Sequence, residues 1–80
     1  MQQVSCQFSV YPLGVTDLGA AVDAALGAIR RHGLEVESGP MSSTVAGPSD
    51  EVFAALRDGF EAAASGGCVL VATVSNACPT

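Results

Sequence analysis

One stretch near the start of the chain alternates apolar and polar side chains so regularly that a β-strand accounts for it best. Between residues 4 and 11 the apolar side chains occupy the even positions and the more polar ones the odd positions. Successive side chains on a strand point to opposite faces of the sheet. The stretch therefore predicts a two-faced strand with Val4, Cys6, Phe8 and Val10 buried and with Ser5, Gln7, Ser9 and Tyr11 on a polar face.

A helix is expected to follow this strand. Thr16 or Asp17 is a suitable N-cap, because a short polar side chain can accept a hydrogen bond from the first turn. A helical stripe of apolar residues then recurs at Leu18, Val22, Ala25 and Ile29. Gly33 is suited to the left-handed conformation that often ends a helix.

The remainder of the chain predicts a hairpin, a second helix and a last strand. Residues 34–38 and 41–47 have strand patterns and are separated by the turn signal Gly39-Pro40. Residues 48–51 resemble a helix start with acidic first-turn residues, and Ser65-Gly66-Gly67 should end that helix. Its buried stripe is expected at Val52, Leu56 and Phe60, flanked by Phe53 and Ala63, and β-branched residues 68–76 predict the final strand before the tail leaves the sheet.

The resulting order β-α-β-β-α-β predicts a single ferredoxin-like α+β domain over residues 1–80. In that fold two helices cover one face of a four-stranded antiparallel sheet, with strand order fourth, first, third, second. The first and third strands are central neighbours, so the polar face of the first strand should lie beside the hydroxyl run of Ser42, Ser43 and Thr44. Which of these three hydroxyls share that face is left open by the pattern.

Composition and charge exclude several classes of function. A chain of 80 residues has a thin core that a partner subunit could supplement, and its net charge of −5 disfavours nucleic acid. Three widely spaced cysteines are best explained as reduced thiols in a cytoplasmic protein. We find neither an apolar leader nor a run long enough to span a membrane. The expected setting is therefore the cytoplasm, without membrane insertion.

No residue pattern points to catalysis or to a bound metal or cofactor. His32, the one histidine, is expected to be a solvated residue capping the first helix. Acylphosphatases of this fold need an arginine in the loop after the first strand, and metal chaperones of this fold need a cysteine pair there. Residues 13–15 are Leu-Gly-Val and supply neither. We therefore expect a protein that is not an enzyme.

The polar face of the first strand suggests a binding surface. Serine and glutamine are poor strand formers, so their use on a central strand suggests that something polar contacts them, although a face that merely meets water would also fit. Tyr11 offers a flat ring and a hydroxyl at the end of the strand, and could equally pack on a neighbouring loop or subunit.

Four segments resemble a known family when they are taken in order: residues 6–13, 39–47, 50–53 and 71–79. The chain is similar at these segments to small ferredoxin-like proteins that bind thiamine and its precursor hydroxymethylpyrimidine. The resemblance implies non-catalytic binding linked to thiamine uptake or salvage. It also implies that a single copy of the domain forms a homodimer or homotetramer.

A flat aminopyrimidine would suit the polar face chemically. Such a ring needs an aromatic platform and several hydrogen-bonding partners. Tyr11 is the expected platform, and the other expected ligand-binding residues are Gln7, Ser9, Ser42, Ser43 and Thr44. The main alternative is an oligomerising structural or regulatory module without a small-molecule ligand. A third hypothesis is a small dimeric enzyme, which the missing acid/base pair disfavours.

Overall fold

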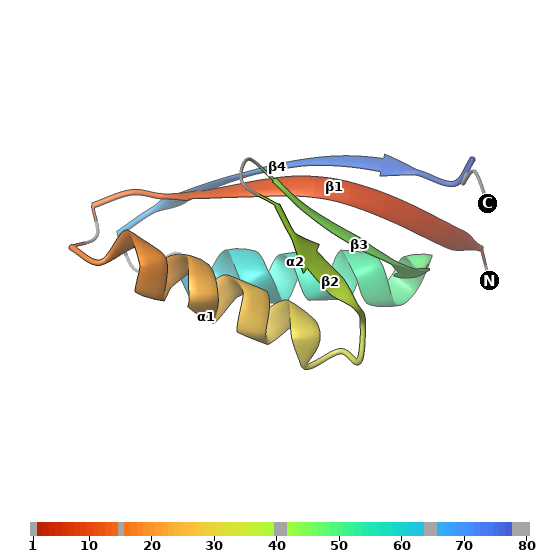
Figure 1. Cartoon of the computed structure of the whole chain (residues 1–80), viewed down its shortest axis with the longest axis horizontal. Coiled ribbons are helices and arrows are strands. Elements are labelled where there is room, and N and C mark those ends of the chain that lie inside the picture. The colour runs from red at the N-terminus through yellow and green to blue at the C-terminus, as the bar shows by residue number, and fades with distance from the viewer. Residues whose placement is uncertain (1, 15, 40–41, 64–65, 78–80) are drawn as a thin grey trace.

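The computed structural model, which describes residues 2–14, 16–39, 42–63 and 66–77, has the predicted fold (Figure 1). The elements in chain order are β1 (Gln3–Pro12), α1 (Leu18–Arg30), β2 (Val36–Ser38), β3 (Ser43–Pro48), α2 (Ser49–Ala63) and β4 (Cys68–Ser75). The sheet has the order β2-β3-β1-β4, with every neighbouring pair antiparallel. Both helices lie on the same side of this sheet (Figure 1). The ferredoxin-like prediction and its strand order are confirmed.

The alternation of β1 sorts its side chains as predicted. Val4, Cys6 and Phe8 are buried in the core, and Val10 packs against the same cluster. The core is completed from α1, β3 and α2 by Leu26, Ile29, Val45, Val52, Ala55 and Leu56. The helices therefore cover the even-numbered face of β1, and its odd-numbered face is left uncovered.

The ends of the elements follow local signals, with small shifts. The Asp17 side chain accepts a hydrogen bond of 3.0 Å from the Ala20 backbone N–H, as an N-cap should. Gly33 has a φ of +78°, which is the left-handed conformation predicted for it. The hairpin strands differ most from prediction, because β2 covers only residues 36–38 and β3 extends to Pro48. The predicted strand residue Met41, the breaker Ser65 and the tail from Cys78 lie outside the described residues.

Three residues that were predicted in the buried stripes of the helices are exposed instead, and one of them is Phe53 of α2, at 56%. Leu18 is 57% exposed, since all four buried residues of α1 lie in the second half of the helix. Phe60 is 40% exposed, and Gly59 beside it is buried instead. A Cβ at Gly59 would lie 2.9 Å from Cδ1 of Ile29, so α1 and α2 approach too closely at this point for a larger residue. The helix contact is therefore centred on small residues and not on the phenylalanine.

No helix in the described part of the chain has the length and apolar content needed to cross a membrane.

Candidate functional site

The uncovered face of the sheet carries the predicted polar residues of β1. Gln7 is exposed, Ser5 and Ser9 are partly buried, and Tyr11 is 52% exposed. Gln7 pairs with Thr44 on β3, and its side-chain amide donates a hydrogen bond of 3.1 Å to Oγ of Ser42. Gln7, Ser42 and Thr44 are thus brought together, and Ser9 and Tyr11 continue along the same strand.

The strand register assigns the hydroxyl run to two faces of the sheet. Thr44 lies opposite Gln7 and therefore shares the uncovered face. Ser43 lies opposite Phe8, whose side chain is buried under the helices, so Ser43 belongs to the helix-covered side. The sequence pattern left this assignment open because hydroxyls occupy all three positions.

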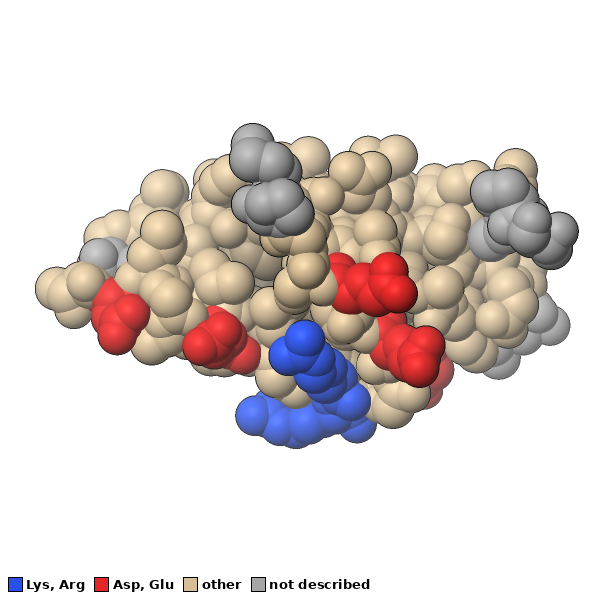
Figure 2. Space-filling model, viewed as in Figure 1, with Lys and Arg blue, Asp and Glu red and all other residues tan. Residues whose placement is uncertain are grey.

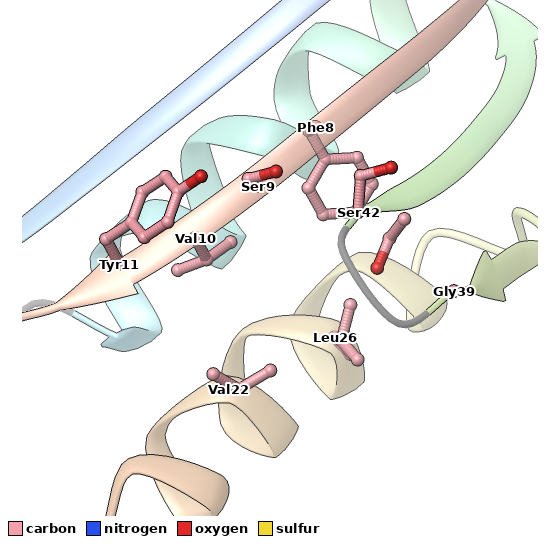
Figure 3. Close-up of a pocket in the computed structure, with 9 residues that line it drawn as sticks. Phe8, Ser9, Val10, Tyr11, Val22, Leu26, Gly39 and Ser42 are labelled. Atoms are coloured by element: carbon pink, nitrogen blue, oxygen red, sulfur yellow. The ribbon is translucent and has the colours of Figure 1, made fainter.

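A cavity opens where β1 continues past the end of β3. The described pairing of these strands stops at Phe8 and Ser43, whereas β1 itself runs on to Pro12. The cavity beside residues 9–11 is bounded by α1, by Gly39 after β2 and by Ser42 before β3 (Figure 3). The residues lining the cavity are Phe8, Ser9, Val10, Tyr11, Val22, Leu26, Gly39, Ser42 and Ser43.

The cavity combines an apolar floor with a rim of hydroxyl groups. Phe8 and Val10 from β1 and Val22 and Leu26 from α1 supply the floor, and the rim is formed by Ser9, Tyr11, Ser42 and Ser43. In Figure 3 the side chains of Val10 and Tyr11 extend to opposite sides of β1. This mixture of apolar wall and few polar groups is typical of small-molecule sites.

The size of the cavity limits what it could enclose. Its volume is ≈ 190 Å³, which is below the range of about 300–1,000 Å³ that is usual for drug-sized ligands. It therefore suits one substituted ring, and any larger molecule would extend out of the mouth. Ser42 accepts the hydrogen bond from Gln7, so its own hydroxyl hydrogen can still be donated to such a ring.

Four of the six predicted ligand-binding residues line this cavity, and Gln7 and Thr44 lie on the neighbouring open face. The sequence reasoning missed the walls, namely Phe8, Val10, Val22, Leu26 and Gly39. An apolar periodicity marks Phe8, Val10 and Val22 as facing inward. It does not show that β3 begins only at Ser43, so that these residues lie beside a gap.

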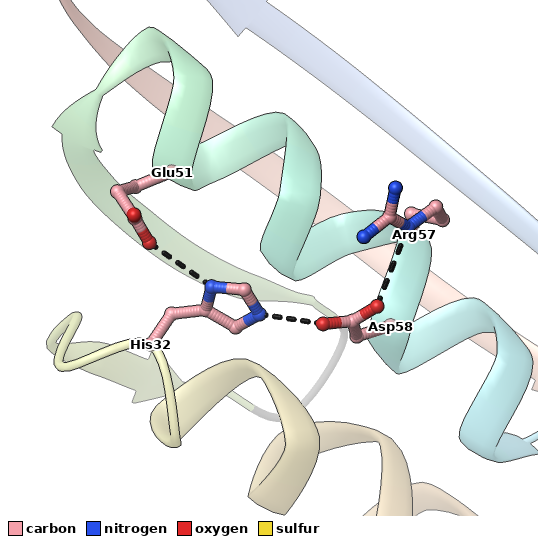
Figure 4. Close-up of polar contacts among 4 residues, drawn as sticks. All are labelled: His32, Glu51, Arg57 and Asp58. Atoms are coloured by element: carbon pink, nitrogen blue, oxygen red, sulfur yellow. Dashed lines mark hydrogen bonds and ion pairs between the residues drawn. The ribbon is translucent and has the colours of Figure 1, made fainter.

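A second polar cluster lies between the two helices, and it corrects the prediction for His32. The ring of His32 contacts Oε2 of Glu51 through Nδ1 at 3.0 Å and Oδ2 of Asp58 through Nε2 at 2.7 Å (Figure 4). The hydrogen bonds to Asp58 and Glu51 raise the pKa of His32, and the hydrogen bond from His32 lowers the pKa of Asp58. His32 therefore bridges two acidic side chains of α2. The prediction that it would be a solvated capping residue was wrong, because the packing of α2 brings these two carboxylates to its ring.

The described cysteines, Cys6 and Cys68, are both free thiols. Burial raises the pKa of Cys6, which disfavours the reactive thiolate. No group of three or more His, Cys, Asp or Glu residues suited to a metal ion occurs within residues 2–14, 16–39, 42–63 and 66–77.

Charge is unevenly distributed over the surface. On the face shown in Figure 2, acidic side chains are spread along α1 and around β2, and basic side chains gather where α1 ends. Asp17 and Asp23 belong to the α1 region and Glu35 and Glu37 to the β2 region, while Arg30 and Arg31 end the helix. Acidic side chains thus predominate along the first part of α1 and around β2, and arginines predominate at the end of α1.

Comparison with known proteins places the chain in a family. A model of the thiamine-binding protein family matches residues 6–76. The chain belongs to the thiamine-binding protein family. No curated protein sequence matches it significantly.

Solved structures agree with this family membership. A candidate thiamine biosynthesis or salvage protein from Thermotoga maritima is similar with a TM-score of 0.74 and 25% identity, over 90% of this chain and 81% of that one. A DUF77 domain of unknown function from Bacillus cereus has a TM-score of 0.83 at 24% identity, over 92% of this chain and 75% of that one. A hypothetical protein from Methanocaldococcus jannaschii has a TM-score of 0.84 at 22% identity, over 94% and 80% of the two chains. The latter two similarities concern the fold alone.

Proposed function

We propose that this member of the thiamine-binding protein family binds thiamine or its hydroxymethylpyrimidine precursor without catalysis, in support of thiamine uptake or salvage. Residues 1–80 act as one ligand-binding domain in this proposal. The observation that carries it is the cavity beside residues 9–11 of β1, with its apolar floor and hydroxyl rim, in a chain whose residues 6–76 match the family.

The pyrimidine ring is the part of the ligand that fits inside. The ring would rest on Val10 and Leu26 and meet the Tyr11 ring at the mouth of the cavity, while Ser42 and Ser43 donate to ring nitrogens or accept from the amino group. Ser9 completes the rim. Gln7 and Thr44 lie at the adjacent open face, where they would contact whatever extends from the cavity.

The charge of the protein agrees with a cationic ligand. Thiamine carries a positive thiazolium ring, and a volume of ≈ 190 Å³ leaves that second ring outside the cavity. The whole chain has a net charge of −5, and Asp23 follows the cavity residue Val22 on α1, while Arg30 and Arg31 lie at the end of that helix. This field attracts the cation and would repel free phosphate groups.

Calorimetric titration with thiamine and with hydroxymethylpyrimidine tests the proposal. Both ligands are expected to bind, and an analogue lacking the amino group should bind more weakly because hydroxyls that the bound ring covers would lose a partner. Ser42→Ala should weaken binding about 3- to 10-fold through one lost hydrogen bond. Tyr11→Ala should weaken it at least about tenfold, with Tyr11→Phe retaining most of the ring contribution.

Thr73→Ala is the matched control for these variants. Thr73 lies opposite Gln7 on β4, on the same uncovered face, but does not line the cavity. This variant should bind like the wild type. Absence of heat from either ligand at millimolar concentration, with the protein folded, would overturn the proposal.

A second function is favoured by a different observation, the apolar half of the uncovered face. Val69 and Val71 are 47% and 55% exposed and pair with Tyr11 and Ser9. Exposed apolar side chains that adjoin on a sheet are a common mark of a subunit contact. The protein would then be a homodimer or homotetramer joined through this face, as a structural or regulatory module or alongside ligand binding.

The solution mass with and without thiamine separates these readings. A homo-oligomer that also binds thiamine supports both proposals. A homo-oligomer that gives no heat with either ligand supports the module alone.

A further inference from the structure

His32 joins the end of α1 to two separate turns of α2. It lies in the turn after α1, and its two carboxylate partners, Glu51 and Asp58, are seven residues apart along α2. Seven residues are about two helical turns, so both carboxylates point to the same side of α2. The imidazole fits between them, with its Nδ1 on one and its Nε2 on the other (Figure 4).

The proton count of this arrangement depends on pH. A carboxylate can only accept a hydrogen bond, so both ring nitrogens of His32 must donate. A neutral imidazole carries one N–H and can donate only once. Both contacts are therefore satisfied at the same time by the imidazolium form, and deprotonation removes one of them.

The surrounding charges make the protonated form the favoured one. From α2, Glu51 and Asp58 bond the ring, and Glu61 lines the same surface hollow as His32. Arg57 also faces Asp58, with its Nε donating to Oδ1 at 3.4 Å, which leaves Oδ2 for His32. From the α1 end, Arg31 lines the hollow and Arg30 lies in the last turn. The His32 side chain is 19% exposed, whereas those of Glu51 and Asp58 are 51% and 38% exposed, so water partly screens both contacts.

We propose that His32 is a proton-operated clasp that holds the end of α1 on α2 through two hydrogen bonds when protonated and through one when neutral. The clasp makes the helix pair looser as the pH rises. Leu26 and Val22 belong to the same helix and form the cavity floor, so opening would also alter the ligand site; that consequence rests on the proposed function.

The direction of the pH effect follows from linkage. The pKa of His32 is raised above its usual 6.5 by the hydrogen bonds to Asp58 and Glu51. The contribution of His32 to the stability of the fold is then fully present below pH 6.5, and it is lost as the pH rises through the raised pKa of His32 in the folded state. The protein should therefore be more stable in mildly acidic than in alkaline solution.

An NMR titration of the imidazole tests the clasp directly, because His32 is the one histidine in the chain. The pKa of His32 is expected above 6.5, with protons on both nitrogens below it. Glu51→Gln and Asp58→Asn should each lower this pKa, and the matched control Glu61→Gln should change it less than either. A pKa at or below 6.5 in the wild type, or an unchanged pKa in Glu51→Gln or in Asp58→Asn, overturns the proposal.

Chemical denaturation and amide hydrogen exchange test whether the contact between α1 and α2 weakens as the pH rises. Between about pH 6 and about pH 9 the wild type should lose stability and exchange faster at the end of α1 after correction for intrinsic rates. His32→Gln should lose this pH dependence while remaining folded. An equal pH dependence in His32→Gln would overturn the clasp. Neither measurement uses a ligand, so a failure of thiamine to bind does not affect its outcome.

Discussion

Two phenylalanines show how differently one residue type is used in this chain. Phe8 is 1% exposed at the centre of the sheet's covered face, whereas Phe53 is 56% exposed on α2. The contribution of a side chain to folding depends on the apolar area that it removes from water and on the cavity its loss would create. The two positions therefore make a matched pair for measurement.

Phe8→Ala should lower the free energy of unfolding by about 3–5 kcal/mol, since it empties the core. Phe53→Ala should change it by less than about 0.5 kcal/mol. Urea denaturation followed by circular dichroism measures both. Because a domain of this size has a small margin of stability, Phe8→Leu provides a milder second variant, expected between the other two. Equal losses at positions 8 and 53 would contradict the assignment of the covered face.

At the scale of the element, α1 depends on a short polar cap. Asp17 accepts a hydrogen bond from the Ala20 N–H, and without it that donor would have no partner within the helix. Asp17→Ala should reduce the stability of the protein by about 1 kcal/mol. Asp17→Asn should retain nearly all of it, because asparagine caps equally well. The thermal midpoint of each variant is the measurement, and a neutral Asp17→Ala would show that this cap is unimportant.

The contact between the helices depends on a glycine in α2. A Cβ at Gly59 would approach Ile29 to 2.9 Å and the Ala25 carbonyl oxygen to 3.2 Å, whereas a Cβ at Gly27 would meet nothing within 4 Å. Gly59→Ala should destabilise the protein by a net of about 1 kcal/mol, because overpacking exceeds the gain in helix propensity.

Gly27→Ala is its control and should stabilise the protein by about 0.5–1 kcal/mol. The change in the free energy of unfolding of both glycine variants is measured from the midpoints of urea denaturation. If both glycine variants were stabilised, the close approach of α1 and α2 at Gly59 would have to be abandoned.

At the scale of the whole molecule, the sheet has one covered and one uncovered face. The uncovered face joins the polar residues of β1 to the exposed Val69 and Val71 of β4. We expect the wild type to sediment as a homodimer or homotetramer and Val71→Asp to shift it towards the monomer, because a charge cannot be buried unpaired in an interface.

The control is Leu18→Asp, which places the same charge on an equally exposed leucine at the start of α1, away from that face. It should leave the sedimentation coefficient unchanged. If Leu18→Asp dissociated the oligomer and Val71→Asp did not, the subunit contact would involve α1 instead.

Periodicity in the sequence was sufficient for the fold. The alternation over residues 4–11 predicted which side of β1 would be buried, and the order of strands and helices predicted the sheet order. These are local patterns, and few chain topologies satisfy them at once. Asp17 as a cap and Gly33 as a left-handed residue are local in the same sense.

Tertiary structure alone decided the features that depend on distances between elements. Strand register separated Ser43 from Thr44, and the start of β3 at Ser43, opposite Phe8, left the cavity beside Tyr11. Where α1 packs on α2, Gly59 is buried and Phe60 is left exposed. The same packing brings His32 between two carboxylates. Side-chain periodicity encodes which face of an element is buried, but not where along its length a partner ends or how closely it approaches.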